Sequence, residues 1–280
     1  MSAYYNENDP FAAAWLRNLI DAKLIAAGDV DERSIVDVKS DDLKSYDQIH
    51  LFAGIGGWSY ALRLAGWPDS RPVWTGSCPC QPLSSAGQRK GHADERHLWP
   101  AFYNLVSECH PATVFGEQVA SKDGREWLAG VRADLEGLGY AVGAADLCAA
   151  SVGAPHRRQR LWWVADANGT RENAGASSWQ QSIRNCYSAR SKATRIAERD
   201  GLEGSSRCEE ARQALAAPWA ASAAVVCNGG ERKRIPLEPG LFPLVDGVSN
   251  RMDRVRAAGN AIVPQVAAAF VKAAMEAGAS

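Results

Sequence analysis

The chain has 280 residues, an apolar content normal for a globular protein and a formal net charge of −1 at pH 7. Its length suits one α/β domain and a smaller region, and no apolar run approaches the ~18 residues that a membrane span needs. The first residues lack the basic and apolar regions of a signal peptide, and the seven cysteines are odd in number and scattered. We therefore expect a cytoplasmic protein with free thiols and no membrane partner.

Apolar periodicity predicts a helix over residues 11–27 and an acidic, loop-like segment up to Asp47. From there strands and helices alternate. The expected strands are 48–53, 72–77, 112–119, 141–148 and 161–165, and the expected helices are 58–65, 98–109, 124–138 and about 262–276. Such alternation is typical of a parallel sheet with helices on both faces.

The composition changes after residue 167. Residues 168–235 have weak periodicity and hold 11 Lys and Arg against 7 Asp and Glu, although the rest of the chain is net negative. We expect a variable insert that is partly disordered or loosely folded, and its positive balance is compatible with DNA binding. The chain is expected to divide into an N-terminal helical extension, a catalytic core, a variable target-recognition region and a C-terminal helix that completes the core: residues 1–47, 48–167, 168–250 and 251–280.

Three short stretches follow predicted strands, where open α/β sheets place their sites. Phe52-Ala-Gly-Ile-Gly-Gly57 lets the backbone approach a ligand closely, or it is only a tight structural turn. Cys78-Pro-Cys80 offers a thiolate nucleophile, a buried structural thiol or, with His92 and His97, a zinc site of unusual spacing. Glu117 ends its strand as a carboxylate of the same crevice, or as a capping or surface residue.

Two further stretches complete the candidates. His156-Arg-Arg-Gln-Arg160 runs into the apolar Leu-Trp-Trp-Val, so we expect some of its arginines to turn inward and not to remain on a solvated face. Gly259-Asn-Ala-Ile-Val-Pro264 opens the last helix and is otherwise an ordinary helix start.

Taken together and in order, these stretches resemble the DNA (cytosine-5)-methyltransferase family. The resemblance runs from about residue 48 to 166 and resumes from about 251 to 272. It rests on Phe-x-Gly-x-Gly at 52–56, Pro79-Cys80-Gln81 with Pro82 and Ser84, Asp94-Glu-Arg-His-Leu98, Glu117-Gln-Val119, Arg158-x-Arg160 and Gly259-Asn260.

The resemblance implies a Rossmann-like, S-adenosylmethionine-dependent methyltransferase fold. It makes Cys80 the nucleophile that attacks C6 of a flipped cytosine and Glu117 the residue that holds the N3 and amino edge. Arg158 and Arg160 would orient the base and a backbone phosphate, and Cys78 would be a bystander. The cofactor residues it implies are Phe52, Gly54, Ile55, Gly56, Gly57, Leu98, Asn260 and Ala261. The residues expected to meet double-stranded DNA, from the resemblance or from local charge, are Pro79, Gln81, Ser84, Arg89, Lys90, Arg232 and Arg234.

The donor side of the site departs from the family pattern. The family places two more strands between the glycine turn and the Pro-Cys loop, which supply an acid for the ribose hydroxyls and an Asp for the adenine. Here Gly54 and Cys80 are only 26 positions apart. The N-terminal segment would fill the gap beside strand 48–53 if Gly28-Asp-Val-Asp-Glu-Arg-Ser-Ile35 replaces the family's Gly-Asp-Ile stretch. Otherwise Asp69 serves as a substitute acid, or donor binding is weakened or altered.

The sequence thus predicts a monomeric DNA cytosine C5 methyltransferase from a phage or restriction-modification setting, with no metal. One alternative is a catalytically silent DNA-binding homologue, which the short interval between Gly54 and Cys80 favours. Another is an enzyme of the same mechanism that uses RNA or a different one-carbon donor. The DNA recognition sequence does not follow from these residues.

Overall fold

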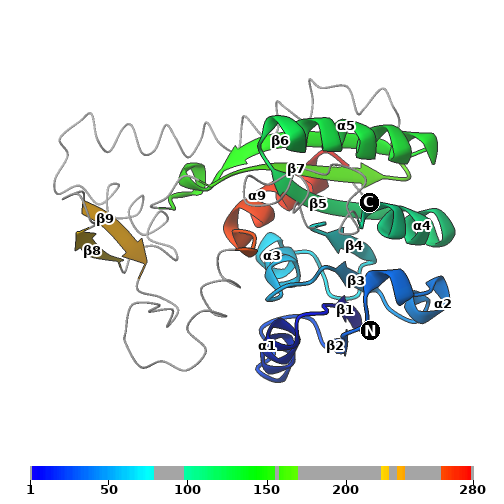
Figure 1. The fold of residues 1–280 in the computed structure, drawn as a ribbon, viewed down its shortest axis with the longest axis horizontal. Coiled ribbons are helices and arrows are strands. Elements are labelled where there is room, and N and C mark those ends of the chain that lie inside the picture. The colour runs from blue at the N-terminus through cyan, green and yellow to red at the C-terminus, as the bar shows by residue number, and fades with distance from the viewer. Residues whose placement is uncertain are drawn as a thin grey trace.

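A seven-stranded sheet forms the centre of the protein, with strand order β2-β1-β3-β4-β5-β7-β6 (Figure 1). The computed structural model describes residues 2–78, 98–154, 158–169, 222–226, 232–236 and 260–278. Neighbouring strands from β2 to β5 are parallel, and β7 runs antiparallel to both β5 and β6. The strands are β1 (Ala3–Asn6), β2 (Gly28–Asp31), β3 (Gln48–Leu51), β4 (Val73–Gly76), β5 (Thr113–Val119), β6 (Ala141–Cys148) and β7 (Gln159–Asp166).

Helices cover both faces of this sheet, as a Rossmann-like fold requires (Figure 1). One face carries α1 (Pro10–Asp21), α3 (Gly57–Ala65) and α9 (Pro264–Glu276), and the other carries α2 (Ser40–Leu43), α4 (Trp99–Cys109) and α5 (Lys122–Gly137). Short 3-10 turns form η1 (Ile35–Asp37) and η4 (Ala149–Val152). The predicted fold class, a mostly parallel α/β sheet covered on both sides, is confirmed.

Alternate residues of the central strands pack into the two hydrophobic cores, one on each face of the sheet. Phe115 and Trp162 join α3 and α9, whereas Val114 and Trp163 join α4 and α5. This period of two, with apolar residues on both faces, is typical of strands buried between two helical layers.

Local sequence explains where the helices near the site begin and end. Asp9 caps α1 by accepting the Phe11 and Ala12 backbone N–H groups, and Pro10 occupies the first turn. Helix α3 follows Gly56, which has a φ of 79°. Residues other than glycine rarely adopt this backbone angle. The turn before α3 is therefore fixed by backbone geometry.

The N-terminal segment belongs to the sheet. Strand β1 pairs in parallel with β3, from Ala3 beside Gln48 to Asn6 beside Leu51, and β2 pairs on its other side. Residues 1–47, expected as a helical extension, instead contribute two strands to the sheet. Strand β1 lies beside strand 48–53, and Gly28–Asp31, the start of the stretch expected to fill this gap, lies one strand further out as β2. Each strand has only four residues, too few for periodicity to separate them from loops.

Within the expected variable region, residues 168–250, the structure describes a two-stranded antiparallel sheet of β8 (Ser222–Val226) and β9 (Arg232–Pro236). Arg232 and Arg234 lie on β9. Apart from residues 168 and 169, the rest of this region lies outside the described residues. In the described part of the chain, no helix has the length and apolar character needed to span a membrane.

Candidate active site

The carboxyl ends of β1 and β3 meet at the glycine turn. Phe52 and Gly54 have positive φ values of 54° and 55°. The Gly54 N–H donates to Glu7 Oε2 at 2.7 Å, and Glu7 Oε1 accepts the Asp9 N–H at 2.9 Å. A Cβ added to Gly54 would meet no heavy atom within 4 Å, so this turn faces open space. The result is an open backbone cradle with a carboxylate on its rim.

Sequence reasoning missed Glu7. The signal was present as a short strand, Ala-Tyr-Tyr-Asn, followed by an acid and then by the Asp9-Pro10 helix start. A strand that ends in an acid just before a capped helix is the pattern that places a carboxylate at the carboxyl edge of a sheet. The four-residue strand was hidden next to the stronger helical pattern that follows it.

The segment that precedes α9 packs against the glycine turn. A Cβ on Gly57 would approach Ile262 Cγ1 to 2.7 Å, so only glycine allows this contact. Ile262 and Val263 are buried, and Ala261 and Asn260 lie just before them. The structure thus brings the predicted cofactor residues 52–57 and 260–261 together although about 200 positions separate them.

Phe52 and Leu98 lie against a second part of the site. Both are partly buried on the core cluster that contains Phe102 of α4, and the Phe52 and Phe102 ring centroids are 6.3 Å apart. Leu98 immediately precedes α4. These two predicted cofactor residues therefore share the α4 side of the sheet.

Strand β4 leads toward the predicted nucleophile. Ser77 follows this strand, and its Oγ accepts the Trp58 indole N–H at 3.0 Å. The Cys78 side chain is buried in the core on the α4 side, which agrees with a bystander role. Cys80 lies outside the described residues, as do Pro79, Gln81, Ser84, Arg89 and Lys90.

Glu117 stands near the carboxyl end of β5, beside β4. Its side chain is buried, and Arg160 Nε lies 2.8 Å from Glu117 Oε1. Arg160 enters from the start of β7, so the pair spans the β5–β7 ladder. Burial raises the pKa of Glu117, while Arg160 and Arg158 partly oppose this shift. A carboxyl in this setting favours the neutral form more than a solvated one does.

Arg158 also turns inward, as the sequence predicted for part of its charge run. Its Nη2 donates to the Ala261 carbonyl at 2.8 Å. Burial lowers the pKa of Arg158, and Arg160 acts in the same direction while Glu117 opposes it. His156, of the same stretch, lies outside the described residues.

Asp69 is not the substitute acid that one alternative required. It pairs with Arg63 at 2.6 Å and follows α3, close to Pro68, whose carbonyl accepts the side chain of Gln48 at the start of β3. Asp69 therefore lies at the amino end of the strands, opposite the glycine turn, and this alternative is wrong.

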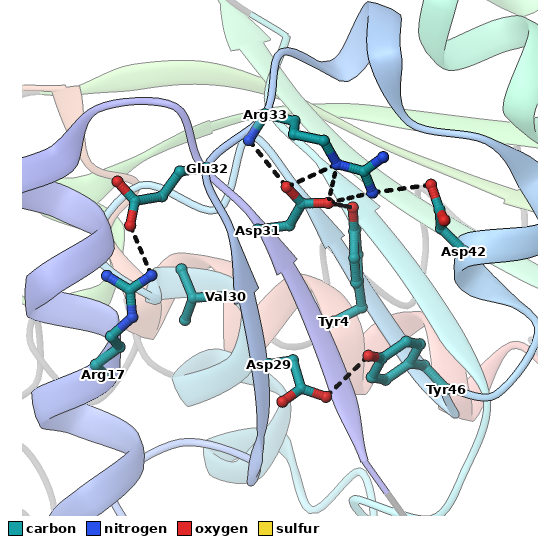
Figure 2. Close-up of a pocket in the computed structure, with 9 residues that line it drawn as sticks. All are labelled: Tyr4, Arg17, Asp29, Val30, Asp31, Glu32, Arg33, Asp42 and Tyr46. Carbon is teal, nitrogen blue, oxygen red and sulfur yellow. Dashed lines mark hydrogen bonds and ion pairs between the residues drawn. The ribbon is translucent and has the colours of Figure 1, made fainter.

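An open pocket of about 490 Å³ lies over the edge strand β2 (Figure 2). Its polar groups are paired with one another: Arg33 binds Asp31 at 2.6 Å and Asp42 at 2.8 Å, and Arg17 binds Glu32 at 2.6 Å. The pocket is lined by Tyr4, Arg17, Asp29, Val30, Asp31, Glu32, Arg33, Asp42 and Tyr46.

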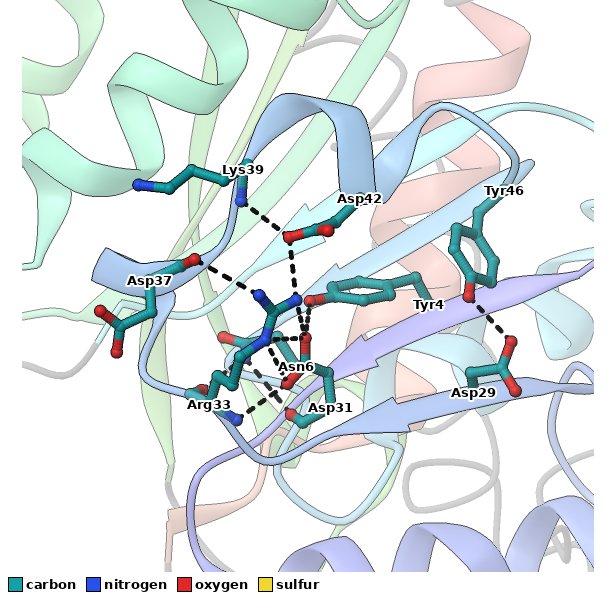
Figure 3. A network of polar contacts seen from close by, with 9 residues as sticks. All are labelled: Tyr4, Asn6, Asp29, Asp31, Arg33, Asp37, Lys39, Asp42 and Tyr46. Carbon is teal, nitrogen blue, oxygen red and sulfur yellow. Dashed lines mark hydrogen bonds and ion pairs between the residues drawn. The ribbon is translucent and has the colours of Figure 1, made fainter.

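The Arg33 network fixes the turn after β2 (Figure 3). Asn6 adds its side-chain amide, which donates to the Arg33 carbonyl at 2.8 Å. Burial opposes ionisation of Asp31, but hydrogen bonds from Arg33 and Tyr4 outweigh it and hold the pKa of Asp31 below its usual value. We assign this network to stability of the β1–β2 edge, since its charged groups already bind one another.

No group of His, Cys, Asp and Glu side chains suited to a metal ion occurs in the described ranges. For the zinc alternative, Cys78 is described, whereas Cys80, His92 and His97 lie outside those ranges.

A family model described as C-5 cytosine-specific DNA methylase matches residues 67–201. The Type II methyltransferase M.HhaI of Haemophilus parahaemolyticus is 28% identical over 174 residues, covering 48% of this chain and 53% of that protein. M.AplI of Arthrospira platensis is 28% identical over 153 residues, covering 42% and 44%, respectively. M.AgeI of Thalassovita gelatinovora is 33% identical over 107 residues, covering 37% and 25%. The chain spans about half the length or less of these curated relatives.

The matched stretch contains Cys80, Glu117 and Arg160 in the order that the sequence resemblance required. It begins after the glycine turn and so leaves out the strands β1, β2 and β3. On this agreement, residues 67–201 are similar to C-5 cytosine-specific DNA methylases, and the curated relatives that match the chain are Type II methyltransferases.

Proposed function

We propose that this protein methylates C5 of cytosine in double-stranded DNA, with S-adenosylmethionine as the donor and Cys80 as the nucleophile. One observation carries the proposal. The Glu7–Gly54 cradle ends β1 and β3, the buried Glu117–Arg160 pair ends β5, and β4 runs between them toward Cys80. A donor side and a base side therefore flank the strand that leads to the nucleophile.

The cradle suits an adenosine-containing donor. Gly54 opens to free space, and the Glu7 carboxylate stands beside it with oxygens that can accept ribose hydroxyls. In the family the acid for the ribose hydroxyls comes from a strand after the glycine turn, and here β1 supplies it from before that turn. When bound, S-adenosylmethionine supplies an electrophilic methyl group. Phe52 and Leu98, both partly buried on the α4 side, offer apolar surface to the donor, and Ile262 packs behind the turn against Gly57.

The chemistry on the base side follows from the groups present. The Cys80 thiolate forms a bond to C6 of a flipped cytosine, which makes C5 nucleophilic. Glu117 holds the N3 edge and supplies a proton there, a role that suits a carboxyl whose pKa is raised by burial. Arg160 orients the Glu117 carboxylate through their ion pair. After methyl transfer, loss of the C5 proton to solvent, breaking of the C6–sulfur bond and return of the N3 proton to Glu117 restore the aromatic base, the thiolate and the carboxyl group.

The silent-homologue alternative drew its support from the short interval between Gly54 and Cys80. Strands β1 and β2 stand in the sheet on the side of β3 away from β4, so the donor side keeps both strands in a different chain order. This arrangement favours an active enzyme over a protein that only binds DNA.

Nucleoside mass spectrometry tests the proposal. DNA from a methylation-deficient bacterial host that expresses the protein should contain 5-methylcytosine, and the Cys80→Ala variant should abolish it. The matched Cys78→Ala variant removes the buried thiol two positions away and should retain the product. A modified cytosine of another mass would show that the enzyme uses a donor other than S-adenosylmethionine. If soluble, folded wild-type protein leaves cytosine unmodified, the proposal is wrong.

A further inference from the structure

Arg158 joins two parts of the chain that lie 103 positions apart. It precedes β7, the strand that carries Arg160, and its Nη2 donates to the Ala261 carbonyl at 2.8 Å. A hydrogen bond from a charged guanidinium to a carbonyl is stronger than a neutral one, especially when the pair is partly shielded from water. The contact therefore holds the carbonyl of Ala261 firmly.

The segment from Ala261 to Val263 is otherwise fixed by packing. Ile262 lies against Gly57 at the start of α3, and Val263 precedes α9 without a side-chain cap. The Val263 carbonyl accepts the Val266 and Ala267 N–H groups at 3.0 and 3.1 Å. A shift of the Ala261 carbonyl would thus disturb both the packing against the glycine turn and the hydrogen bonds in the first turn of α9.

The two arginines of the motif have different partners. Arg160 binds Glu117, on the base side, whereas Arg158 binds the backbone of the segment beside the glycine turn. The family resemblance gave both arginines to the base and a phosphate. The hydrogen bond to Ala261 gives Arg158 a second contact, while its charge, like that of Arg160, still opposes the pKa rise of Glu117.

We infer that Arg158 is a positioning residue for the donor: by holding the Ala261 carbonyl, it keeps the 261–263 segment against the glycine turn. This inference rests on the proposed function for the identity of the donor. It makes Arg158 act through the segment that it holds, and it predicts a defect in donor binding before any DNA is present.

The test compares Arg158→Met, which keeps an apolar stem without a donor group, with Arg158→Lys, which keeps a charged donor. Arg132→Met, on the exposed face of α5, is the matched control because Arg132 pairs there with Glu136. Binding of S-adenosylmethionine without DNA is measured by calorimetry. Backbone hydrogen exchange at Val266 and Ala267 is measured in the absence of any ligand.

The Met variant should bind the donor about tenfold more weakly and exchange faster at these two amides, with the Lys variant between it and wild type. The Arg132 control should match wild type in both measurements. Unchanged donor affinity and unchanged exchange in a folded Met variant would overturn the inference. A defect seen only with DNA would also overturn it, because it would mean that Arg158 acts on the base or a phosphate.

The two proposals fail in different ways. If the wild-type protein does not bind S-adenosylmethionine, the proposed donor is wrong, and the exchange rates alone decide whether Arg158 holds the segment. Faster exchange in the Met variant would then support the role of Arg158 in holding the segment, and equal exchange would contradict it.

Discussion

Glu117 combines burial with two nearby arginines, and burial dominates. Its pKa is raised, so ionised Glu117 costs folding free energy that the protonated form does not. The stabilising protonated state is fully present below the pKa of the unfolded chain and is lost as the pH rises through the folded-state pKa. The same property suits a residue that delivers a proton to the base.

The Glu117→Gln variant keeps the shape but cannot ionise or supply a proton. We expect its turnover to fall by about 10²–10⁴-fold, the usual contribution of a general acid. Relative to wild type, it should gain stability as the pH rises from 4 to 8. Urea unfolding at several pH values measures this difference, and a variant that loses stability relative to wild type at high pH would contradict the pKa direction.

His50 is a second buried titratable residue, in the middle of β3. Its Nδ1 lies 2.8 Å from Thr75 Oγ1, its ring stacks on Tyr5, and burial lowers its pKa to about 3. Neutral His50 therefore stabilises the fold above the pKa of the unfolded chain, and this stabilisation is lost as the pH falls through the folded-state pKa.

The His50→Gln variant should reduce the acid sensitivity of the protein. In wild type this one group contributes a slope of up to about 1.4 kcal/mol per pH unit in the free energy of unfolding between pH 6.5 and 3. Urea unfolding at pH 7, 5 and 4 should show a shallower decline in the variant. Parallel curves for the two proteins would mean that His50 does not titrate with this shift.

The β1–β2 pair precedes the glycine turn in this chain, whereas the family pattern places two strands after that turn. Gly28 starts β2 beside Ala3, and a Cβ there would lie 1.8 Å from the Ala3 carbonyl oxygen. Because that neighbour is backbone, the strands would have to separate. The edge of the sheet depends on this glycine.

The Gly28→Ala variant should lose about 1–3 kcal/mol of stability, in the range of overpacked sites. Gly130→Ala is a matched control, since a Cβ on this exposed residue of α5 meets nothing within 4 Å. The control should gain about 0.5–1 kcal/mol, because alanine is the better helix former. Thermal and urea unfolding measure both, and a Gly28→Ala protein as stable as wild type would show that β2 tolerates a shift.

Most elements could be predicted from the sequence because they are long or strongly patterned. Helix 124–138 and strand 141–148 agree with α5 and β6 within two residues. Strands β1 and β2 could not be predicted this way, since four residues give no clear period and their burial depends on pairing with β3. Glu117, Arg158 and Arg160 were predicted from their motif, and the structure pairs Glu117 with Arg160, whereas Glu7 had no motif in its expected place.

Over the whole molecule, the basic residues concentrate in the region that contains β8 and β9, although the chain is net negative. Arg232 and Arg234 lie on β9. We predict that Arg232→Ala together with Arg234→Ala weakens DNA binding and lowers the slope of log affinity against log salt by up to about 2, because each phosphate contact contributes ~0.9. Fluorescence anisotropy across salt concentrations measures the slope, with Arg132→Ala as control. An unchanged slope would remove these residues from the DNA interface.

The site is assembled from distant parts of the chain. The glycine turn comes from β3, the carboxylate beside it from β1, the buried Glu117 from β5 and the segment over the turn from the residues before α9. The chain order of the strands can change because a parallel sheet places all carboxyl ends at one edge, whatever their sequence. We therefore predict that the N-terminal strands complete the donor side.

Calorimetric titration of S-adenosylmethionine into the protein without DNA tests this prediction. Wild type should bind, Glu7→Gln should bind about tenfold more weakly, and Glu32→Gln should bind as wild type does because Glu32 pairs with Arg17 at the exposed edge. If wild type and Glu7→Gln bind the donor equally well, the N-terminal strands do not line its site, and the prediction is wrong.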